Sequence, residues 1–362
     1  MKDRIQKQKL LQYFLSRLNY PQLEVEVIYA ERIAAKPKII TDIDVMAMAA
    51  DNSGVLTPIL GDCKTLKGQS PINRVFWLKG LSSYFGADSG IVLLSKKIEN
   101  EHQLLSSELG ISLLSGDDFN IYSAGTGNLE DVSTSSIIKL ENWDKYFDIP
   151  NRFSNLNQLY SYCRMGFWNE KDYTLRLRHS LARIRAVKRE MNPDNNLCMF
   201  LFLELSSQFA IALNELSIKT FYKYLLPENK ETFDKELKIL LWGGYETYTF
   251  VNELRSRLVS SSTNDSNELS LPEWESFVNL VRSCLDKPLS TALTPIILKE
   301  LAFSYLEEQE SLVKYRFLER LLKNDPYASK MAIQILDYLT KGSKIPQDFS
   351  RIPNSMLMKL QR

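Results

Sequence analysis

Two apolar segments joined by a short glycine-containing turn constrain the fold of this chain more than any other feature. Residues 39–49 and 55–65 have the composition of β-strands, and the residues between them end in Asn-Ser-Gly. A three-residue hairpin loop favours a type I turn followed by one residue in the left-handed region, which suits Gly54. We therefore expect an antiparallel hairpin here.

The turn also fixes which residues of the hairpin face each other. With Ser53 at the centre of the loop, the numbers of opposite residues sum to about 106 in an idealised register. Asp44 is then expected opposite Asp62. Pro58 cannot donate a ladder hydrogen bond, so we expect a bulge or an unpaired side at that point of the strand.

The elements around the hairpin predict an α/β domain over residues 1–123. The spacing of apolar residues predicts helices at 5–18, 72–85 and 99–109. Alternating or continuous short apolar runs predict strands at 23–28, 90–95 and 111–114. Gly86 suits the end of the second of these helices. Helices alternating with strands in this order are expected to flank a mixed sheet.

The second half of the chain has a different pattern. Residues 124–154 show little periodicity and are interpreted as a linker, including a Gly-Thr-Gly that lacks the context of a dinucleotide site. From residue 155 to 362 the pattern is helical, with Thr294 and Asp325 each preceding a proline as a helix N-cap would. We expect an all-α domain for recognition or partner binding.

The hairpin carries a charged pattern in otherwise apolar strands. Residues two apart on a strand share a face, so Asp62 and Lys64 point one way and Cys63 the other, while Asp42 and Asp44 share a face. In the register above, Asp44, Asp62 and Lys64 converge. Carboxylates held that close repel unless a cation lies between them, and Mg²⁺ prefers such oxygen ligands. An exposed hairpin with solvated charges is the alternative.

These residue types suit phosphodiester hydrolysis. A metal ion polarises a phosphate oxygen and lowers the pKa of a bound water. Lys64 is expected to orient that water or to stabilise charge on phosphorus, and the Cys63 backbone carbonyl is a further candidate ligand.

An aspartate on one strand, a turn, and Asp-x-Lys on the next resembles the PD-(D/E)XK, restriction-endonuclease-like nuclease family. The similarity is greatest to its restriction and repair branch, in which Asp-Val precedes a Glu/Asp-Cys-Lys segment, and it covers the first third of the chain. The resemblance implies a restriction-endonuclease-like fold, Asp44 and Asp62 as ligands of Mg²⁺ or Mn²⁺, Lys64 as catalytic lysine, and cleavage of DNA or, less often, RNA. It also suggests restriction or anti-phage defence.

One residue of the family pattern is missing. Many members carry a glutamate on the first helix, but residues 5–18 contain no acid. Glu24, Glu26 or Glu31 could take its place from the adjacent strand, and Glu26 is our candidate for a further metal ligand.

Binding of nucleic acid would need local positive charge, because 45 Lys and Arg balance 44 Asp and Glu. Gln69 and Arg74 follow the motif and could contact phosphate. Residues 173–189 form a basic amphipathic helix in which Arg178, Arg185 and Arg189 are the candidates. A membrane surface is another possible partner, and a solvated face packed on neighbouring helices is the alternative reading.

The cysteines and the apolar segments indicate the cellular compartment to expect for this protein. The four cysteines form no CxxC pair, which favours a reducing, cytoplasmic setting over a zinc site or a disulfide framework. The most apolar window, 197–213, contains Glu204 and is interpreted as a buried helix, so no membrane span is expected.

Two functions remain open from the sequence. The first is a Mg²⁺-dependent DNA endonuclease. A homodimer is one option for it, because double-strand cutting often uses two active centres. The second is a non-catalytic nuclease-fold scaffold whose helical domain binds a protein partner in a larger assembly.

Overall fold

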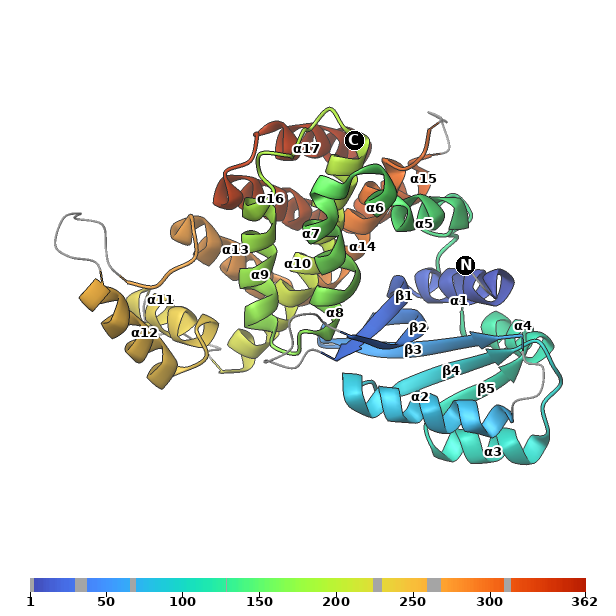
Figure 1. Cartoon of the computed structure of the whole chain (residues 1–362). Helices are drawn as coiled ribbons and strands as arrows, with labels where there is room; N and C mark the ends of the chain where they lie inside the picture. The colour runs from blue at the N-terminus through green and yellow to red at the C-terminus, as the bar shows by residue number, and fades with distance from the viewer. Residues whose placement is uncertain are drawn as a thin grey trace.

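The computed structural model describes residues 3–29, 38–65, 70–127, 129–223, 230–258, 268–308 and 314–362. A five-stranded mixed sheet flanked by helices forms the N-terminal part, and a helical region follows it (Figure 1). The coarse layout predicted from the sequence is therefore confirmed.

The N-terminal elements follow the predicted order. They are α1 (Arg4–Ser16), β1 (Tyr20–Tyr29), β2 (Lys38–Ala50), β3 (Leu56–Lys64), α2 (Pro71–Phe85), β4 (Ser89–Leu94), α3 (Asn100–Glu108), β5 (Ile111–Ser115) and α4 (Gly116–Thr126). The strand order is β1-β2-β3-β4-β5, antiparallel through β3 and parallel from there. Helix α1 lies on one side of the sheet and α2 and α3 lie on the other (Figure 1).

The hairpin has the register that its turn predicts. Val45 lies opposite Gly61 and Met46 opposite Leu60, which are pairs of the expected series. Gly54 takes a φ of 84°, the left-handed conformation that favours glycine. Pro58 pairs in step with β2 without a bulge, and it precedes the first β3 residue that pairs with β4, so one side of β3 is unpaired there.

The helical region begins earlier than expected. In the segment interpreted as a linker, α4 extends to Thr126, and α5 (Leu140–Phe147), α6 (Ile149–Arg152) and a 3-10 turn η1 (Ser154–Leu156) follow. A capping box starts α4, because Ser115 and Asp118 exchange side-chain to backbone hydrogen bonds. That signal was present in the sequence, and it lies at the end of a strand where a turn is also expected.

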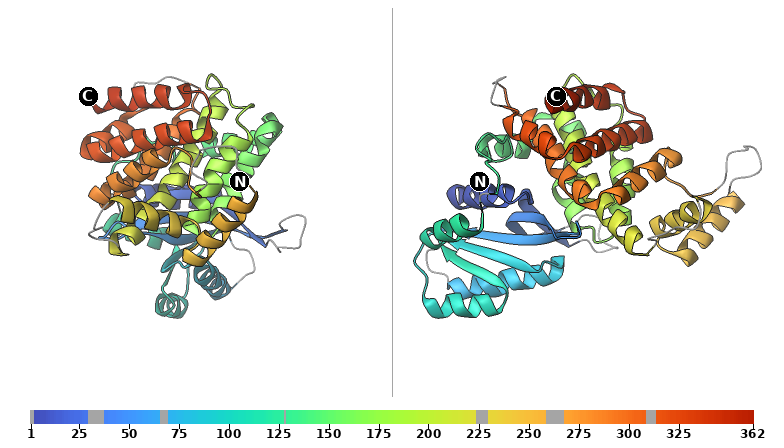
Figure 2. Two further views of the ribbon diagram at one scale, coloured as in Figure 1. Left: turned by 90° about the vertical axis from the view of Figure 1, so that its left-hand side faces the viewer. Right: turned by 180° about the vertical axis from the view of Figure 1, so that it is seen from behind.

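The remaining elements complete the region around α10. They are α7 (Asn157–Ser161), the π-helical turn η2 (Tyr162–Gly166), α8 (Phe167–Asn169), α9 (Tyr173–Ala186), α10 (Asn196–Lys223), α11 (Lys230–Leu241), α12 (Tyr245–Leu258), α13 (Trp274–Asp286), α14 (Pro288–Ser304), α15 (Arg316–Asn324), α16 (Pro326–Ser343) and α17 (Asp348–Gln361). Helix α10 runs through the middle of these helices (Figure 2). It is long and apolar enough to cross a membrane, but 89% of its most apolar window is buried inside the protein, as in a core helix.

A buried ion pair connects the sheet to the helical region. Lys299 of α14 and Glu204 of α10 are both 0% exposed, and their Nζ and Oε1 atoms lie 2.8 Å apart. The same ammonium donates to Gln22 Oε1 at 2.8 Å and to Tyr20 Oη at 3.1 Å, both on β1. Strand β1 is thus tied by hydrogen bonds to α14, which is paired in turn with α10.

A second buried carboxylate makes stability depend on pH. Glu300 accepts hydrogen bonds from Ser135 Oγ at 2.5 Å and from the Ser136 amide at 2.7 Å, but its burial outweighs them and raises its pKa to about 7. The unfolded chain releases this proton near its ordinary pKa of about 4.5. As pH rises from about 4.5 to 7, the unfolded state loses the proton first, so the free energy of unfolding should fall by about 3 kcal/mol.

We expect Glu300→Gln to remove this component. Between pH 5 and pH 8 the wild type should lose about 3 kcal/mol of free energy of unfolding relative to the variant. Urea unfolding of both proteins at the two pH values measures this difference. The exposed Glu141→Gln serves as control and should leave the pH dependence unchanged. Parallel curves for wild type and Glu300→Gln would contradict the prediction.

Candidate functional site

Asp44 lies at the centre of a row of acidic residues on three neighbouring strands. Asp62 on β3 stands one position beyond the last regular pair, Val45 with Gly61. Glu24 on β1 occupies the matching position on the other side of Asp44. Its φ is 52°, a left-handed conformation that is costly outside glycine. Strain of this kind is characteristic of functional sites, where the surrounding structure holds it in place.

Two lysines neutralise Asp44. Its side chain is 1% exposed, with Oδ1 at 2.7 Å from Lys7 Nζ and Oδ2 at 2.9 Å from Lys64 Nζ. The Cys63 amide also donates to Oδ2 at 2.8 Å. Burial by itself would raise the pKa of Asp44, but the two ammonium groups and these hydrogen bonds outweigh it and lower the pKa. Asp44 is therefore held as a carboxylate.

Lys64 joins the two aspartates, as its position on β3 predicts. Its Nζ lies 2.9 Å from Asp44 Oδ2 and 3.8 Å from Asp62 Oδ1. Burial works against its charge, yet Asp44 and Asp62 outweigh burial and raise its pKa. The side chain is 30% exposed, so its ammonium can reach a molecule outside the sheet.

Asp62 is also held by an arginine from α2. Arg74 Nε donates to Asp62 Oδ2 at 2.8 Å, and Nη2 donates to Oδ1. The guanidinium stacks on the Trp77 ring, 4.1 Å from its centroid. Burial raises the pKa of Asp62 in spite of this partner. Arg74, expected to contact phosphate, is thus paired with an acid of the site.

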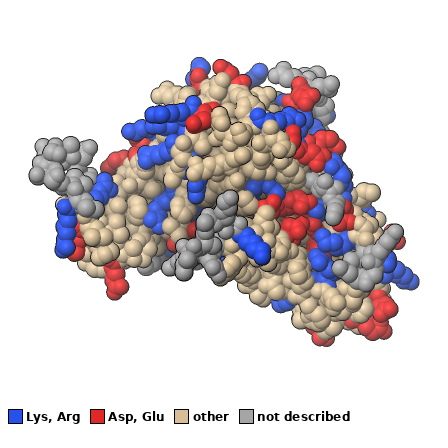
Figure 3. Space-filling view, viewed as in Figure 1, with Lys and Arg blue, Asp and Glu red and all other residues tan. Residues whose placement is uncertain are grey.

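The charged groups line a cavity of about 590 Å³. Its lining consists of Asp3, Lys7, Glu24, Asp42, Asp44, Lys64, Phe147 and Arg164. Acidic and basic side chains gather together where the sheet meets the helical region (Figure 3). Asp62 is fully buried behind this lining, so of the two aspartates predicted to bind metal only Asp44 faces the cavity.

The carboxylates in the cavity fit a divalent cation. Glu24, Asp42 and Asp44 each offer an oxygen, and these oxygens lie within 4.8 Å of one another. An octahedral Mg²⁺ binds oxygens at about 2.0–2.1 Å, so opposite ligands stand about 4 Å apart. Lys7 bonds to both Glu24 and Asp44, and a bound cation would share these two carboxylates with its ammonium.

The structure brings Glu24, and not Glu26, to the metal-binding group. Glu26 Oε1 instead lies 3.6 Å from Arg164 Nη2. Glu31 lies outside the described residues. The β1–β2 register would have identified Glu24, but no short turn joins these two strands in the sequence, so the register could not be derived.

Lys7 was also missed, although the sequence held a signal for it. It stands on the apolar stripe of α1, one turn before Leu11 and two turns before Phe14. A lysine that is fully buried in such a position is almost always paired with an acid. It is 2% exposed, and Asp44 and Glu24 raise its pKa although burial opposes them.

Three other predicted nucleic-acid contacts, Arg178, Arg185 and Arg189, are not in the cavity lining. Arg178 stacks on Trp242 at 4.5 Å and burial lowers its pKa, while Arg185 Nε donates to the Gly342 carbonyl at 2.9 Å. Arg189 follows the end of α9 and is exposed. Gln69 lies outside the described residues.

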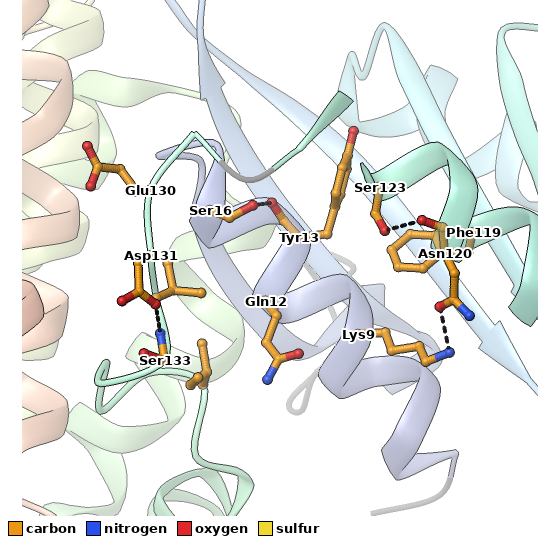
Figure 4. Close-up of a pocket in the computed structure, with 12 residues that line it drawn as sticks. Lys9, Gln12, Tyr13, Ser16, Phe119, Asn120, Ser123, Glu130, Asp131 and Ser133 are labelled. Carbon is orange, nitrogen blue, oxygen red and sulfur yellow. Dashed lines mark hydrogen bonds between the residues drawn. The ribbon is translucent and has the colours of Figure 1, made fainter. Parts of the chain in front are cut away.

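Another cavity, of about 620 Å³, lies between α1, α4 and the segment before α5 (Figure 4). Its polar groups bond to one another, as Lys9 Nζ does to Asn120 Oδ1 at 3.0 Å and the Ser133 amide to Asp131 Oδ1 at 2.9 Å. Such self-satisfied groups offer a ligand little, so we assign no site there.

Comparison with known proteins adds no further guide to the site. No family model, no curated protein and no solved structure matches the chain.

Proposed function

We propose that the chain is a Mg²⁺-dependent endonuclease that hydrolyses DNA phosphodiester bonds, with a PD-(D/E)XK-like N-terminal domain. The observation that carries the proposal is the ammonium of Lys64, which lies within 4 Å of both Asp44 and Asp62 beside a 590 Å³ cavity. A rigid strand pair positions these groups, as a catalytic site requires. Restriction or anti-phage defence is the context that the family resemblance suggests.

Each residue has a role that follows from its surroundings. Glu24, Asp42 and Asp44 would hold Mg²⁺ or Mn²⁺, which when bound polarises a phosphate oxygen and lowers the pKa of a water. Lys64 faces the cavity and would stabilise the charge that develops on the phosphate oxygens.

Asp62 differs from the assignment that the resemblance implies. Because it is buried and paired with Arg74, we propose that it positions Lys64 and does not ligate metal in this arrangement. Cys63 is likewise fully buried and absent from the cavity lining, so its carbonyl is given no metal role in this proposal.

The test is a metal-binding and cleavage assay on wild type and Asp44→Asn. The variant keeps an oxygen for the Cys63 amide but removes the charge at the centre of the site. Metal affinity should fall at least about 10-fold, since even outer-shell partners of metal ligands contribute this much. Isothermal titration with Mn²⁺ measures affinity, and cutting of supercoiled DNA with Mg²⁺ measures activity.

Asp51→Asn is the matched control, because Asp51 lies at the tip of the same hairpin and its Oδ1 accepts from the Ser53 and Val55 amides, as an asparagine can. It should bind metal and cut DNA like wild type. If Asp44→Asn also cut like wild type, the cleavage would come from a contaminant and the proposal would be wrong.

A second function, the non-catalytic scaffold, is favoured by Lys7. Its ammonium already neutralises Asp44 and Glu24, much as a metal ion would. In that case the helical region would bind a protein partner. If titration with Mn²⁺ gives no more binding heat with wild type than with Asp44→Asn, the result would support the scaffold over the nuclease.

A further inference from the structure

A cavity of about 480 Å³ lies between the β2–β3 hairpin, the end of α2, and helices α8 and α10. It lies between the sheet and the helical region, and part of its lining comes from β2, the strand that carries Asp44. Met46 lines it and lies two residues after Asp44, so the two side chains share one face of β2 about 7 Å apart. The volume falls within the range of small-molecule sites.

The inner lining is apolar and suits a flat ring. Met46 and Met48 come from β2, and Trp168 comes from α8 and is 4% exposed. Thioether and indole groups pack well against aromatic faces. Tyr84 stands in the lining and is 43% exposed, and Lys171 Nζ lies 4.1 Å from the centroid of its ring.

One buried amide in the lining has no partner among the described residues. Asn214 of α10 is 1% exposed, and neither its Oδ1 nor its Nδ2 makes a hydrogen bond there. A buried donor and acceptor left unpaired are costly, so such groups in a folded protein call for an explanation. A ligand with an adjacent donor and acceptor would satisfy both atoms.

The same lining holds three cations and one carboxylate. Glu215 Oε1 lies 3.1 Å from Lys219 Nζ, and Glu215 Oε2 lies 3.8 Å from Arg176 Nη1. Lys171 is the third cation. Burial lowers the pKa of Arg176, while Glu215 and the nearby Glu170 and Asp172 act in the opposite direction. The excess of positive charge suits an anionic group such as phosphate.

We propose that this cavity binds an adenine nucleotide. The ring lies against Met46, Met48 and Trp168, the amide of Asn214 takes the adjacent donor and acceptor of adenine, and the phosphate lies by Lys171 and Lys219. Asparagine pairs with the adenine edge in this bidentate way in nucleic-acid recognition. The ligand is a free nucleotide or an adenosine residue of a nucleic acid strand.

The test is isothermal titration of the metal-free protein with AMP, adenosine and ribose 5-phosphate. AMP should bind at least about 10-fold more tightly than either fragment, because each fragment lacks one of the two contacts. Titration with a single-stranded oligodeoxyadenylate identifies the source: tighter binding than AMP indicates a nucleic acid strand, and weaker binding indicates a free nucleotide.

Asn214→Leu separates a ligand role from a structural one. Loss of the bidentate pair should weaken AMP binding about 10-fold or more. Its melting temperature should equal or exceed that of wild type, because the variant removes unpaired buried polar atoms. Lys219→Gln should also weaken AMP binding, while the exposed Lys235→Gln on α11 should not.

Absence of AMP binding to wild type at millimolar concentration would overturn the proposal. So would unchanged affinity in Asn214→Leu. The Asp44→Asn variant should still bind AMP, so this result does not depend on the proposed nuclease activity.

Discussion

Replacing Lys64 with methionine is expected to lower the rate of Mg²⁺-dependent DNA cleavage by about 100-fold to 1000-fold. Loss of one preorganised group that stabilises transition-state charge has an effect of this size. Lys64 is the cation that contacts both Asp44 and Asp62 and is also 30% exposed toward the cavity. Single-turnover cleavage of a labelled duplex at saturating Mg²⁺ measures the chemical step.

The fold should survive this substitution. Asp44 keeps its contacts with Lys7 and with the Cys63 amide, so no buried carboxylate is left alone. The melting temperature of the variant should confirm this. Lys96→Met, at an exposed lysine after β4, is the matched control and should cut at the wild-type rate. A Lys64→Met protein that cuts as fast as wild type would remove Lys64 from the mechanism.

Replacing Lys299 with methionine is expected to lower the free energy of unfolding by about 3–5 kcal/mol. The substitution leaves the Glu204 carboxylate buried without its cation, and breaking one side of a buried ion pair has this effect. It also removes the donor for Gln22 and Tyr20 on β1. Urea unfolding at pH 7 measures the change.

The double variant Lys299→Met with Glu204→Leu tests the cause. Replacing both charges with apolar groups should recover most of the lost stability, since the desolvation of an unpaired charge is then absent. Lys323→Met is the control: this lysine pairs with Glu319 at a surface where they are 50% and 40% exposed. It should change the free energy by less than about 1 kcal/mol. Equal losses in the single and double variants would show that packing, not charge, dominates.

Local patterns predicted most of the N-terminal fold. The hairpin register followed from Gly54 and strand periodicity, both of which act within a few residues. The long helix α10 followed from its apolar run. The helices in segment 124–154 were harder to predict, because the apolar face of α5 is short and its packing partners are distant in sequence. The contact between Lys139 and Glu307, more than 150 residues apart, illustrates this.

The residues of the candidate site also fall into those that local sequence predicted and those that only the tertiary structure identified. The sequence by itself placed Asp44, Asp62 and Lys64 together, because alternation along a strand and one tight turn determine which side chains meet. Only the tertiary structure decided their partners. Lys7 comes from a helix packed across the sheet, Glu24 from a strand joined by a long connection, and Arg74 from the helix on the other face.

These partners depend on long-range packing, which a residue's neighbours in sequence do not specify. For this reason the sequence determined that acidic residues and a lysine converge on one strand pair. The tertiary structure decided that the acid beside Asp44 is Glu24 and that Asp62 is buried against Arg74. It also decided that the amide of Asn214, which has no partner among the described residues, borders a cavity on the same face of β2.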